Sequence, residues 1–244
     1  MKTYKRILAF DIGGTGLKAA VIDPKGKLIS EHLHVATPRP AEPKQVVKLL
    51  VEMGKSIMPF DCISIGFPGV VKGTRVVTAP NLGTDMWAGF DLAGQLSKKL
   101  GHKPARLTND ADMQGLAVVR GKGLEFVMTL GTGFGTALFL NGELMPHMEI
   151  AHLPIHDGKD FDDYIGDRAL KKIGKKKWNK RIEKILPMMY SLLHFDHVYI
   201  GGGNARHIDF KLPPHTSIVP NIAGIEGGAA LWRHGDRVVV TALS

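Results

Sequence analysis

Short apolar runs alternate with glycine-rich turns at the start of the chain. Residues 7–10 form one apolar run, and residues 17–23 form a second after a pair of adjacent glycines. Runs of this length, joined by turn residues, are typical of β-hairpins. A further turn at residues 24–27 leads into a third expected strand near residues 28–35. The pattern therefore predicts an antiparallel meander of three strands.

Helix and strand patterns alternate through the next part of the chain. Pro43 suits the first turn of a helix, and apolar spacing carries that helix to about residue 57. The next expected elements are a buried strand over residues 62–67, a helix over 91–100, a strand over 105–110 and a helix over 111–119.

A second hairpin repeats the pattern of the first. Its strands, over residues 126–130 and 135–140, enclose the turn Gly131-Thr132-Gly133. Two strand–turn–strand units in one chain predict a duplicated α/β fold with a cleft between its halves. We place the boundary near Lys103, which gives lobes over residues 1–103 and 104–244.

The second half of the chain has a more helical pattern. Apolar side chains recur at helical spacing at Trp178, Ile182, Ile185 and Met189. Pro187 within this run predicts a kink or an interruption. Residues 198–200 are expected to form a strand that opens into Gly201-Gly202-Gly203. A helix over residues 223–232 follows, and we expect it to pack back on the N-terminal lobe.

Composition narrows the class of protein. Hydrophobic residues make up 44% of the 244 residues and charged residues 23%, as in ordinary globular proteins. Cys62 is the only cysteine, which excludes an internal disulfide and a cysteine-based zinc site and fits a reducing, cytoplasmic compartment. No apolar stretch approaches the roughly 20 residues of a membrane-spanning helix, so we expect no membrane partner. The net charge of +9 fits either a polyanionic partner or solubility alone.

The turn of the first hairpin, Asp11-Ile12-Gly13-Gly14-Thr15-Gly16, is a candidate phosphate site. Adjacent glycines let the backbone approach an anion closely, and Thr15 and Lys18 add a hydroxyl donor and a positive charge. Asp11, at the strand end, is placed to hold a metal ion through water. The alternative is a plain hairpin turn with an exposed aspartate. Gly131-Thr132-Gly133 has the same context and would supply a second set of donors.

Asn109-Asp110 is the strongest candidate for catalysis. The pair ends a predicted strand just before a helix, where α/β folds bind their ligands. A carboxylate there can accept the proton of a sugar hydroxyl during phosphoryl transfer; alternatively, either side chain caps the helix. Glu149 and His152 offer an acceptor and a donor to a polyhydroxylated ligand, or form a surface ion pair. The irregular spacing of His147, His152 and His156 argues against zinc.

Two further segments have open interpretations. Gly201-Gly202-Gly203 would let an adenine or ribose approach the backbone closely, or would serve only as a flexible turn. Residues 171–181 carry seven basic residues in eleven. Such a run is typical of a solvated helix face, but also of a track for polyphosphate, nucleotide or nucleic acid. We interpret Trp178 in this run as a core anchor, not as a base-stacking platform.

Taken in order, these motifs resemble the ROK (repressor, open reading frame, kinase) family of the actin-like ATPase superfamily. Within that family the chain is most similar to the polyphosphate-type glucokinases. The resemblance covers nearly the whole chain and rests on residues 10–18, 66–71, 109–112, 130–136 and 200–203, together with 175–178 and 221–227. It implies two actin-like (ribonuclease H-like) lobes that close on a hexose. It also implies Mg2+ and a phosphoryl donor, ATP, polyphosphate or both, without zinc.

The resemblance implies roles for individual residues. Asp110 would be the general base for the sugar 6-hydroxyl. The sugar site would contain Gly69, Asn81, Asn109, Asp110, Glu149 and His152. The phosphate and nucleotide contacts would come from Asp11, Gly13, Gly14, Thr15, Gly16, Lys18, Gly131, Thr132, Gly133, Gly201, Gly202 and Gly203. A polyanion track would contain Lys175, Lys176 and Lys177, and Asp11 would hold Mg2+ through water.

The chain departs from the family pattern at the sugar site. Ala151 stands where the family has glycine in an acid–x–Gly–His element. The zinc-binding cysteine cluster of most members is absent, as in the polyphosphate-type subgroup. The later sugar-site glutamate has no certain counterpart, and Asp162 or Asp163 would replace it. These departures leave the choice of sugar, glucose with or without mannose, more open than the reaction.

The leading hypothesis is a cytoplasmic glucokinase-like phosphotransferase without a nucleic-acid partner, with a homodimer as one option. One alternative is a sugar-sensing ROK-type regulator. Such regulators resemble this fold with a DNA-binding domain in front, for which the position of Asp11 leaves no room. A second alternative is a non-catalytic actin-like ATPase, against which the pair Asn109-Asp110 argues.

Overall fold

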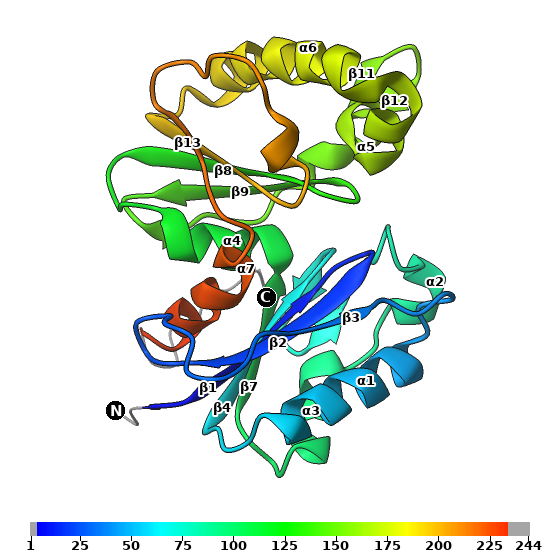
Figure 1. The fold of residues 1–244 in the computed structure, drawn as a ribbon, viewed down its shortest axis with the longest axis vertical. Helices are drawn as coiled ribbons and strands as arrows, with labels where there is room; N and C mark the ends of the chain where they lie inside the picture. Colours follow the sequence, from blue (N-terminus) through cyan, green and yellow to red (C-terminus); the bar gives the residue numbers. More distant parts are fainter. Residues whose placement is uncertain (1–3, 234–244) are drawn as a thin grey trace. The chain divides into compact units, whose positions relative to one another are not determined.

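The computed structural model describes residues 4–233 and divides into two compact units (Figure 1). The first unit runs to Ala117 and is completed by the segment from Ile222, and the second unit is Val118–Asn221. We had placed the lobe boundary near Lys103. The division falls later because most of α4 (Asp110–Val118), which continues directly from the last strand of the first sheet, stays with that sheet.

The first unit is built on a five-stranded sheet in the order β3-β2-β1-β4-β7. Its strands are β1 (Ile7–Ile12), β2 (Gly16–Ile22), β3 (Leu33–Ala36), β4 (Cys62–Phe67) and β7 (Ala105–Asn109). The antiparallel pairing of β1 with β2 and of β2 with β3 confirms the predicted meander. The third strand begins later than expected, at Leu33. β4 and β7 continue the sheet in parallel, so that β4 and β7 both end at the same edge.

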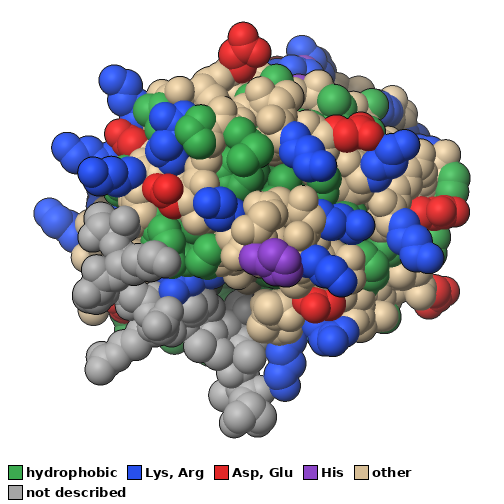
Figure 2. Space-filling model, turned by 90° about the horizontal axis from the view of Figure 1, so that it is seen from below, with side chains coloured by type: hydrophobic (Ala, Val, Ile, Leu, Met, Phe, Trp, Pro, Cys, Tyr) green, Lys and Arg blue, Asp and Glu red, His purple; other side chains and the backbone are tan. Residues whose placement is uncertain are grey.

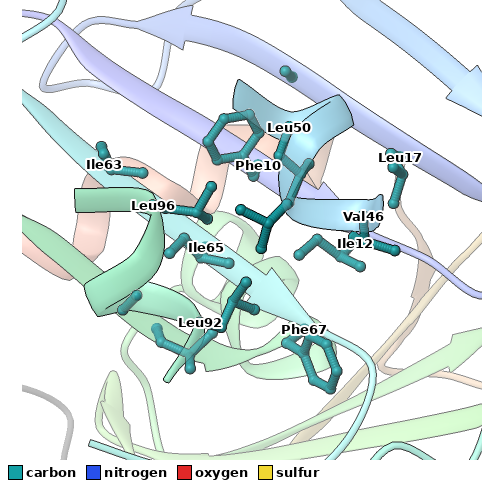
Figure 3. Packing of buried hydrophobic residues seen from close by; sticks show 14 of the residues in the cluster. Phe10, Ile12, Leu17, Val46, Leu50, Ile63, Ile65, Phe67, Leu92 and Leu96 are labelled. Carbon is teal, nitrogen blue, oxygen red and sulfur yellow. The ribbon is translucent and has the colours of Figure 1, made fainter. Parts of the chain in front are cut away.

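Successive residues of β1 point to opposite faces of this sheet, and each face has its own cover. On one face, Phe10 packs with Leu50 of α1 (Pro43–Ser56) and Leu96 of α3 (Leu92–Lys99), as Figure 3 shows. On the other face, Ala9 packs with Ile225 of α7 (Ala223–Glu226). Both helices expected near residues 43–57 and 91–100 are therefore confirmed.

The segment that follows α7 is a 3-10 helix, η3 (Gly227–Trp232), and it is tied to the first sheet by polar contacts. Ser64 Oγ donates to Gly228 O at 2.7 Å, and Trp232 Nε1 donates to Ser64 Oγ at 2.8 Å. Arg106 donates to Leu231 O and lies over the Trp232 ring. The tail of the described chain is thus part of the first unit, and it contains a short α-helix and a 3-10 helix where the sequence predicted one helix.

Three small elements complete the first unit, namely β5 (Val71–Lys72), β6 (Arg75–Val76) and α2 (Thr84–Trp87). β5 and β6 form a hairpin. Trp87 is fully buried, its ring lies 4.9 Å from that of Phe67, and its Nε1 donates to Ala41 O at 2.9 Å. These contacts anchor α2 to the end of β4 and to the segment that precedes α1.

The second unit repeats the arrangement with a five-stranded sheet in the order β10-β9-β8-β13-β14. Its strands are β8 (Leu124–Leu130), β9 (Phe134–Leu140), β10 (Glu143–Leu144), β13 (His197–Gly201) and β14 (Thr216–Ile218). The hairpin of β8 and β9 confirms the second predicted strand–turn–strand unit. The remaining elements are η1 (Ile150–His152), β11 (Pro154–His156), β12 (Lys159–Asp160), α5 (Phe161–Ile165), α6 (Asp167–Leu193) and η2 (Ala205–His207).

The long helix α6 is interrupted at Gly174, whose φ of 75° and ψ of 161° are not helical. The sequence had predicted a kink or an interruption at Pro187. The helix is not interrupted there, and Pro187 lies within it. Glycine carries no penalty for positive φ, so it accommodates the break between the two parts of α6. Trp178, directly after the break, is fully buried and donates from Nε1 to Ile165 O at 2.8 Å, which confirms its reading as a core anchor. No helix between residues 4 and 233 has the length and apolarity needed to span a membrane.

Candidate functional site

The β1–β2 turn of the first unit has the tight form that the sequence predicted. Gly13 N–H donates to Gly16 O at 2.9 Å, which closes the turn. Two residues beyond β3 hold it from outside. Thr37 Oγ1 donates to Gly13 O at 2.7 Å, and Arg39 donates to Gly14 O at 2.6 Å. Thr37 and Arg39 were not found from the sequence, because neither belongs to a glycine motif and both act across 24 to 25 residues.

Asp11 and Lys18 face each other across this hairpin. Their Oδ2 and Nζ atoms lie 2.8 Å apart, and the two side chains are only 15% and 17% exposed. The cross-strand register of β1 and β2 pairs the two residues directly. A methyl group added at Gly224 would lie 2.8 Å from Asp11 Oδ2, so glycine leaves room for this carboxylate. Mg2+ binds carboxylate oxygens, directly or through water, so the Asp11 side chain fits the expected ion. One of its oxygens, Oδ2, is also paired with the Lys18 ammonium group.

Asn109 ends β7 and caps α4. Its Oδ1 accepts from Ala111 N–H at 2.8 Å and from Asp112 N–H at 3.3 Å, while its Nδ2 donates to Gly69 O at 3.2 Å. The capping alternative raised from the sequence is therefore realised by Asn109, which is buried at 4% exposure. The same side chain fixes the loop after β4 against the start of α4.

Asp110 begins α4 immediately after this cap. One carboxylate oxygen, Oδ1, lies 2.8 Å from Ala111 N. Asp110 is more exposed than the fully buried Asp112. Asn109 accepts most of the hydrogen bonds that cap α4. The Asp110 carboxylate is partly accessible, and it lies at the end of the parallel strands, where α/β folds bind ligands.

Gly69 and Asn81 lie in two loops of the first unit that pack against each other, and Gly69 O contacts Asn109. A methyl group at Gly69 would stand 2.1 Å from Thr78 O, so only glycine allows the two loops to approach this closely. Asn81 O accepts from Arg39 at 3.3 Å. Arg39 therefore joins the glycine turn, through Gly14 O, to the loop that carries Asn81.

The second unit forms a closely related turn between β8 and β9. Gly131 N–H donates to Gly133 O at 3.0 Å, and Asn204 Nδ2 donates to Gly131 O at 3.1 Å. Gly202, with φ of 83°, packs so tightly that a methyl group there would lie 2.4 Å from Leu130 O. The glycine segment after β13 is thus packed against the turn after β8. The structure brings these two sequence-predicted motifs together. The sequence did not reveal the hydrogen bond from Asn204 to Gly131 O.

Asp162 of α5 contacts the residue that follows this turn. Its Oδ1 accepts from Phe134 N–H at 2.6 Å. Burial raises the pKa of Asp162, although the Phe134 N–H and the nearby His152 partly oppose that effect. The carboxylate therefore braces the start of β9, a contact that reaches across 28 residues and has no signature in the sequence.

Glu149 lies at the centre of a small polar cluster in the second unit. Its Oε1 is 3.1 Å from His147 Nε2, and its Oε2 is 4.0 Å from His152 Nε2. His152 Nδ1 is 3.3 Å from Asp160 Oδ2. Burial disfavours the Glu149 anion, but the hydrogen bond and charge of His147, with the charge of His152, outweigh burial and lower the pKa of Glu149. Glu149 and His152 thus lie at ion-pair distance, and the lowered pKa of Glu149 favours its ionised form as a hydrogen-bond acceptor.

The three lysines Lys175, Lys176 and Lys177 are exposed at the start of the second part of α6. Asn179, one turn later, anchors them. Its Nδ2 donates to Lys175 O and to His207 O, at 3.1 and 2.8 Å. Burial first, and then the charges of Lys175 and Arg206, lower the pKa of His207. Lys175 and Arg206 therefore both lie near His207 of η2. Among the described residues, no group of three or more histidine, cysteine or acidic side chains is arranged to hold a metal ion.

Comparison with known proteins places these motifs in a family. The model of the ROK family matches residues 7–159. The chain belongs to the ROK family. It is 32% identical to a polyphosphate glucokinase of Mycobacterium tuberculosis, over 93% of this chain and 91% of that protein. The resemblance seen in the sequence is thereby confirmed.

Solved structures agree with this assignment. The inorganic polyphosphate/ATP-glucomannokinase of Arthrobacter sp. strain KM is similar with a TM-score of 0.82 and 32% identity, covering 93% of this chain and 97% of that one. A ROK family glucokinase of Streptomyces griseus, solved with glucose and AMPPNP, gives a TM-score of 0.75 at 21% identity. The predicted α/β fold with two actin-like units is that of the ROK sugar kinases.

Proposed function

We propose that this protein is a glucokinase-type phosphotransferase that moves a phosphoryl group from polyphosphate, ATP or both to the 6-hydroxyl of glucose, and of mannose. The observation that carries this proposal is the 32% identity, over 93% of the chain, shared with both a polyphosphate glucokinase and a polyphosphate/ATP-glucomannokinase. The regulator alternative is not favoured. A ROK family transcriptional regulator shares only 13% identity, which speaks for the fold alone.

Asp110 is the proposed general base. The sugar hydroxyl oxygen bonds to the terminal phosphorus of the donor, and its proton passes to the Asp110 carboxylate. The bond from that phosphorus to its bridging oxygen breaks, and the shortened donor leaves with the electron pair. A positioned base of this kind contributes typically 10²- to 10⁴-fold to the rate. Support comes from the position of Asp110 at the end of β7, with its helix capped by Asn109.

The sugar-binding role is proposed for residues of both units. In the first unit these are Gly69, Asn81 and Asn109, with Asn109 acting through its hydrogen bond to Gly69 O. In the second unit they are Glu149, His152 and Asp162. The lowered pKa of Glu149 supports an ionised acceptor for sugar hydroxyls, whereas the hydrogen bond of Asp162 to Phe134 N–H supports a positioning role.

The two glycine turns are proposed to hold the donor phosphates, through the backbone N–H groups that do not close the turns and through the Lys18 side chain. The first set is Gly13, Gly14, Thr15, Gly16 and Lys18, and the second is Gly131, Thr132 and Gly133; Gly201, Gly202 and Gly203 would face the nucleotide. Asp11 would hold Mg2+ through water, and the ion would neutralise phosphate charge as the bond breaks. Lys175, Lys176 and Lys177 would contact the part of the donor beyond the transferred phosphate.

The reaction is tested by a coupled assay of the purified protein, with glucose and mannose each crossed with ATP and polyphosphate. We expect the 6-phosphate of glucose with at least one donor. Failure of every sugar–donor pair, in the presence of Mg2+ and with the fold verified by circular dichroism, would contradict the proposal.

We further propose a cytoplasmic location, since the one cysteine, Cys62, is a buried free thiol. The homodimer stays a prediction, to be checked by light scattering.

A further inference from the structure

A row of lysines follows one side of helix α1 in the first unit. Lys44, Lys48 and Lys55 are spaced by four and seven residues, which brings them to the same side of an α-helix. At 1.5 Å of rise per residue, the row is about 16 Å long. Lys99, at the end of α3, lines the same groove together with Val51 and Glu52 of α1. The groove therefore carries four ammonium groups and one carboxylate.

These lysines lack carboxylate partners. Within the part of the chain that the structure describes, none of the four ammonium groups lies within 4.0 Å of an acidic side chain, whereas Lys18 and Lys171 each have such a pair. Unpaired like charges along one helix repel each other, and a bound anion would relieve that repulsion. The face drawn in Figure 2 likewise carries more Lys and Arg side chains than acidic ones.

The residues that line the groove fit inorganic polyphosphate better than a single-stranded nucleic acid or a membrane surface. A single-stranded nucleic acid is bound with aromatic side chains on which its bases stack, but the groove is lined only by lysine, valine and glutamate. A membrane surface is bound by an amphipathic helix with a free apolar face. The apolar face of α1, with Val46 and Leu50, is already buried in the core. A linear chain of phosphates without bases needs only the row of positive charges.

We propose that this groove between α1 and α3 binds inorganic polyphosphate, as an anchoring site outside the glycine turns. The inference rests on the proposed function in one respect, namely that polyphosphate is a donor. The chain connects the two places directly. Arg39, which contacts Gly14 of the first turn, precedes Lys44 by five residues, which span at most about 18 Å. A long donor held in the groove is thereby kept at high effective concentration near the turn.

The test compares wild type with the quadruple variant Lys44→Gln, Lys48→Gln, Lys55→Gln and Lys99→Gln. The matched control carries the same charge change at four other exposed lysines: Lys25→Gln, Lys27→Gln, Lys72→Gln and Lys122→Gln. Binding of long-chain sodium polyphosphate is measured by calorimetry without sugar, at several salt concentrations. We expect the groove variant to bind at least about tenfold more weakly. Its plot of log affinity against log salt should be shallower by roughly 3, since each single-strand phosphate contact contributes about 0.7.

Activity and a competing ligand distinguish the outcomes. The groove variant should keep its activity with ATP and lose the advantage of long over short polyphosphate chains. Equal polyphosphate affinity in the groove and control variants would overturn the anchoring site, even if the protein is a kinase. Preferential loss of single-stranded RNA binding, with polyphosphate binding unchanged, would overturn it in favour of nucleic acid. Failure of all sugar phosphorylation would contradict the proposed function and leave the binding measurement as the separate test of the groove.

Discussion

Asn109 Nδ2 donates a hydrogen bond to Gly69 O, 40 residues earlier in the chain, while Asn109 Oδ1 caps the helix that begins with Asp110. One buried carboxamide thus fixes both the loop after β4 and the position of the proposed base. The donor and the acceptor half of the carboxamide can be removed separately, which makes the relationship testable.

Asn109→Ala removes both halves. We expect it to lower the free energy of unfolding by about 1–3 kcal/mol, since a helix cap and a buried hydrogen bond are lost together. Asn109→Ser keeps a capping oxygen but is too short to reach Gly69 O, so it should cost less stability than Asn109→Ala while still raising KM for the sugar. Denaturant unfolding and steady-state kinetics measure the two effects. Equal unfolding energies for both variants would show that the cap contributes nothing.

Asp110→Asn should lower kcat by about 10²- to 10⁴-fold, because the amide cannot accept the sugar proton. Sugar binding, measured by calorimetry in the absence of donor, should change little. The variant keeps the size of the side chain, and the helix cap at Asn109 is untouched. Turnover near that of wild type would show that another group takes the proton.

Gly202 and Gly203 form a matched pair in the second unit. Gly202→Ala places a methyl group 2.4 Å from Leu130 O at a φ of 83°, whereas a methyl group at Gly203 has no heavy atom within 4 Å. We therefore expect Gly202→Ala to displace the glycine segment from the turn after β8 and to weaken donor binding severalfold or more. Gly203→Ala should leave stability nearly unchanged. Thermal unfolding is measured for both variants and donor KM for Gly202→Ala, and a similar loss of stability in the two variants would contradict the packing argument.

Glu125 is the main candidate for an acid-sensitive group. Its buried carboxylate accepts from the N–H groups of Arg120, Gly121 and Lys122 and from the Tyr199 hydroxyl at 2.7–3.1 Å. Burial opposes ionisation, yet these donors outweigh it and hold the pKa of Glu125 below its ordinary value of 4.5. The stabilisation is therefore complete above pH 4.5 and is lost as pH falls through the lowered pKa.

Glu125→Gln should lower the free energy of unfolding at pH 7 by about 1–3 kcal/mol and should flatten the loss of stability between roughly pH 5 and pH 3. Tyr199→Phe, which removes one donor of the four, serves as the milder comparison. Urea unfolding across this pH range, followed by circular dichroism, measures both. A Glu125→Gln protein with the pH profile of wild type would show that the unfolding free energy does not depend on this carboxylate.

Neutralising the basic patch on α6 tests the proposed polyanion track. Replacing Lys175, Lys176 and Lys177 with glutamine should raise KM for polyphosphate more than KM for ATP, because a longer anion engages more positive charges. Lys175 lies near His207, whose pKa its charge lowers, so Lys175→Gln is the single variant to compare with the triple variant. The donor assay at two ionic strengths measures it, and equal changes for both donors would argue against a dedicated track.

Local patterns were enough to predict most of the fold. The short apolar runs and glycine turns correctly indicated β1, β2, β8 and β9, because these elements depend on residues adjacent in sequence. Pro187 does not interrupt the helix, whereas Gly174 does, with a positive φ that only the structure shows.

Contacts across long sequence separations could not be predicted in the same way. Arg39 at Gly14, Asp162 at Phe134 N–H and Asn204 at Gly131 join segments 25, 28 and 73 residues apart. Each partner is a backbone group that any residue would supply, so nothing in the sequence indicates the contact. The sequence thus identified the motifs of the site, and Asp162 as a candidate, but not the hydrogen bonds that hold those motifs in place.

The return of residues 222–233 to the first sheet has a consequence for the order of folding. The second unit is continuous in sequence, so all of its strands have been synthesised before that segment is made. The first sheet, in contrast, exposes Ala9 and Ser64 on one face until Ile225 and Gly228 emerge from the ribosome. During synthesis the unit begun first is therefore the unit finished last, and its uncovered face is the part of the nascent chain most exposed to chaperones and to aggregation.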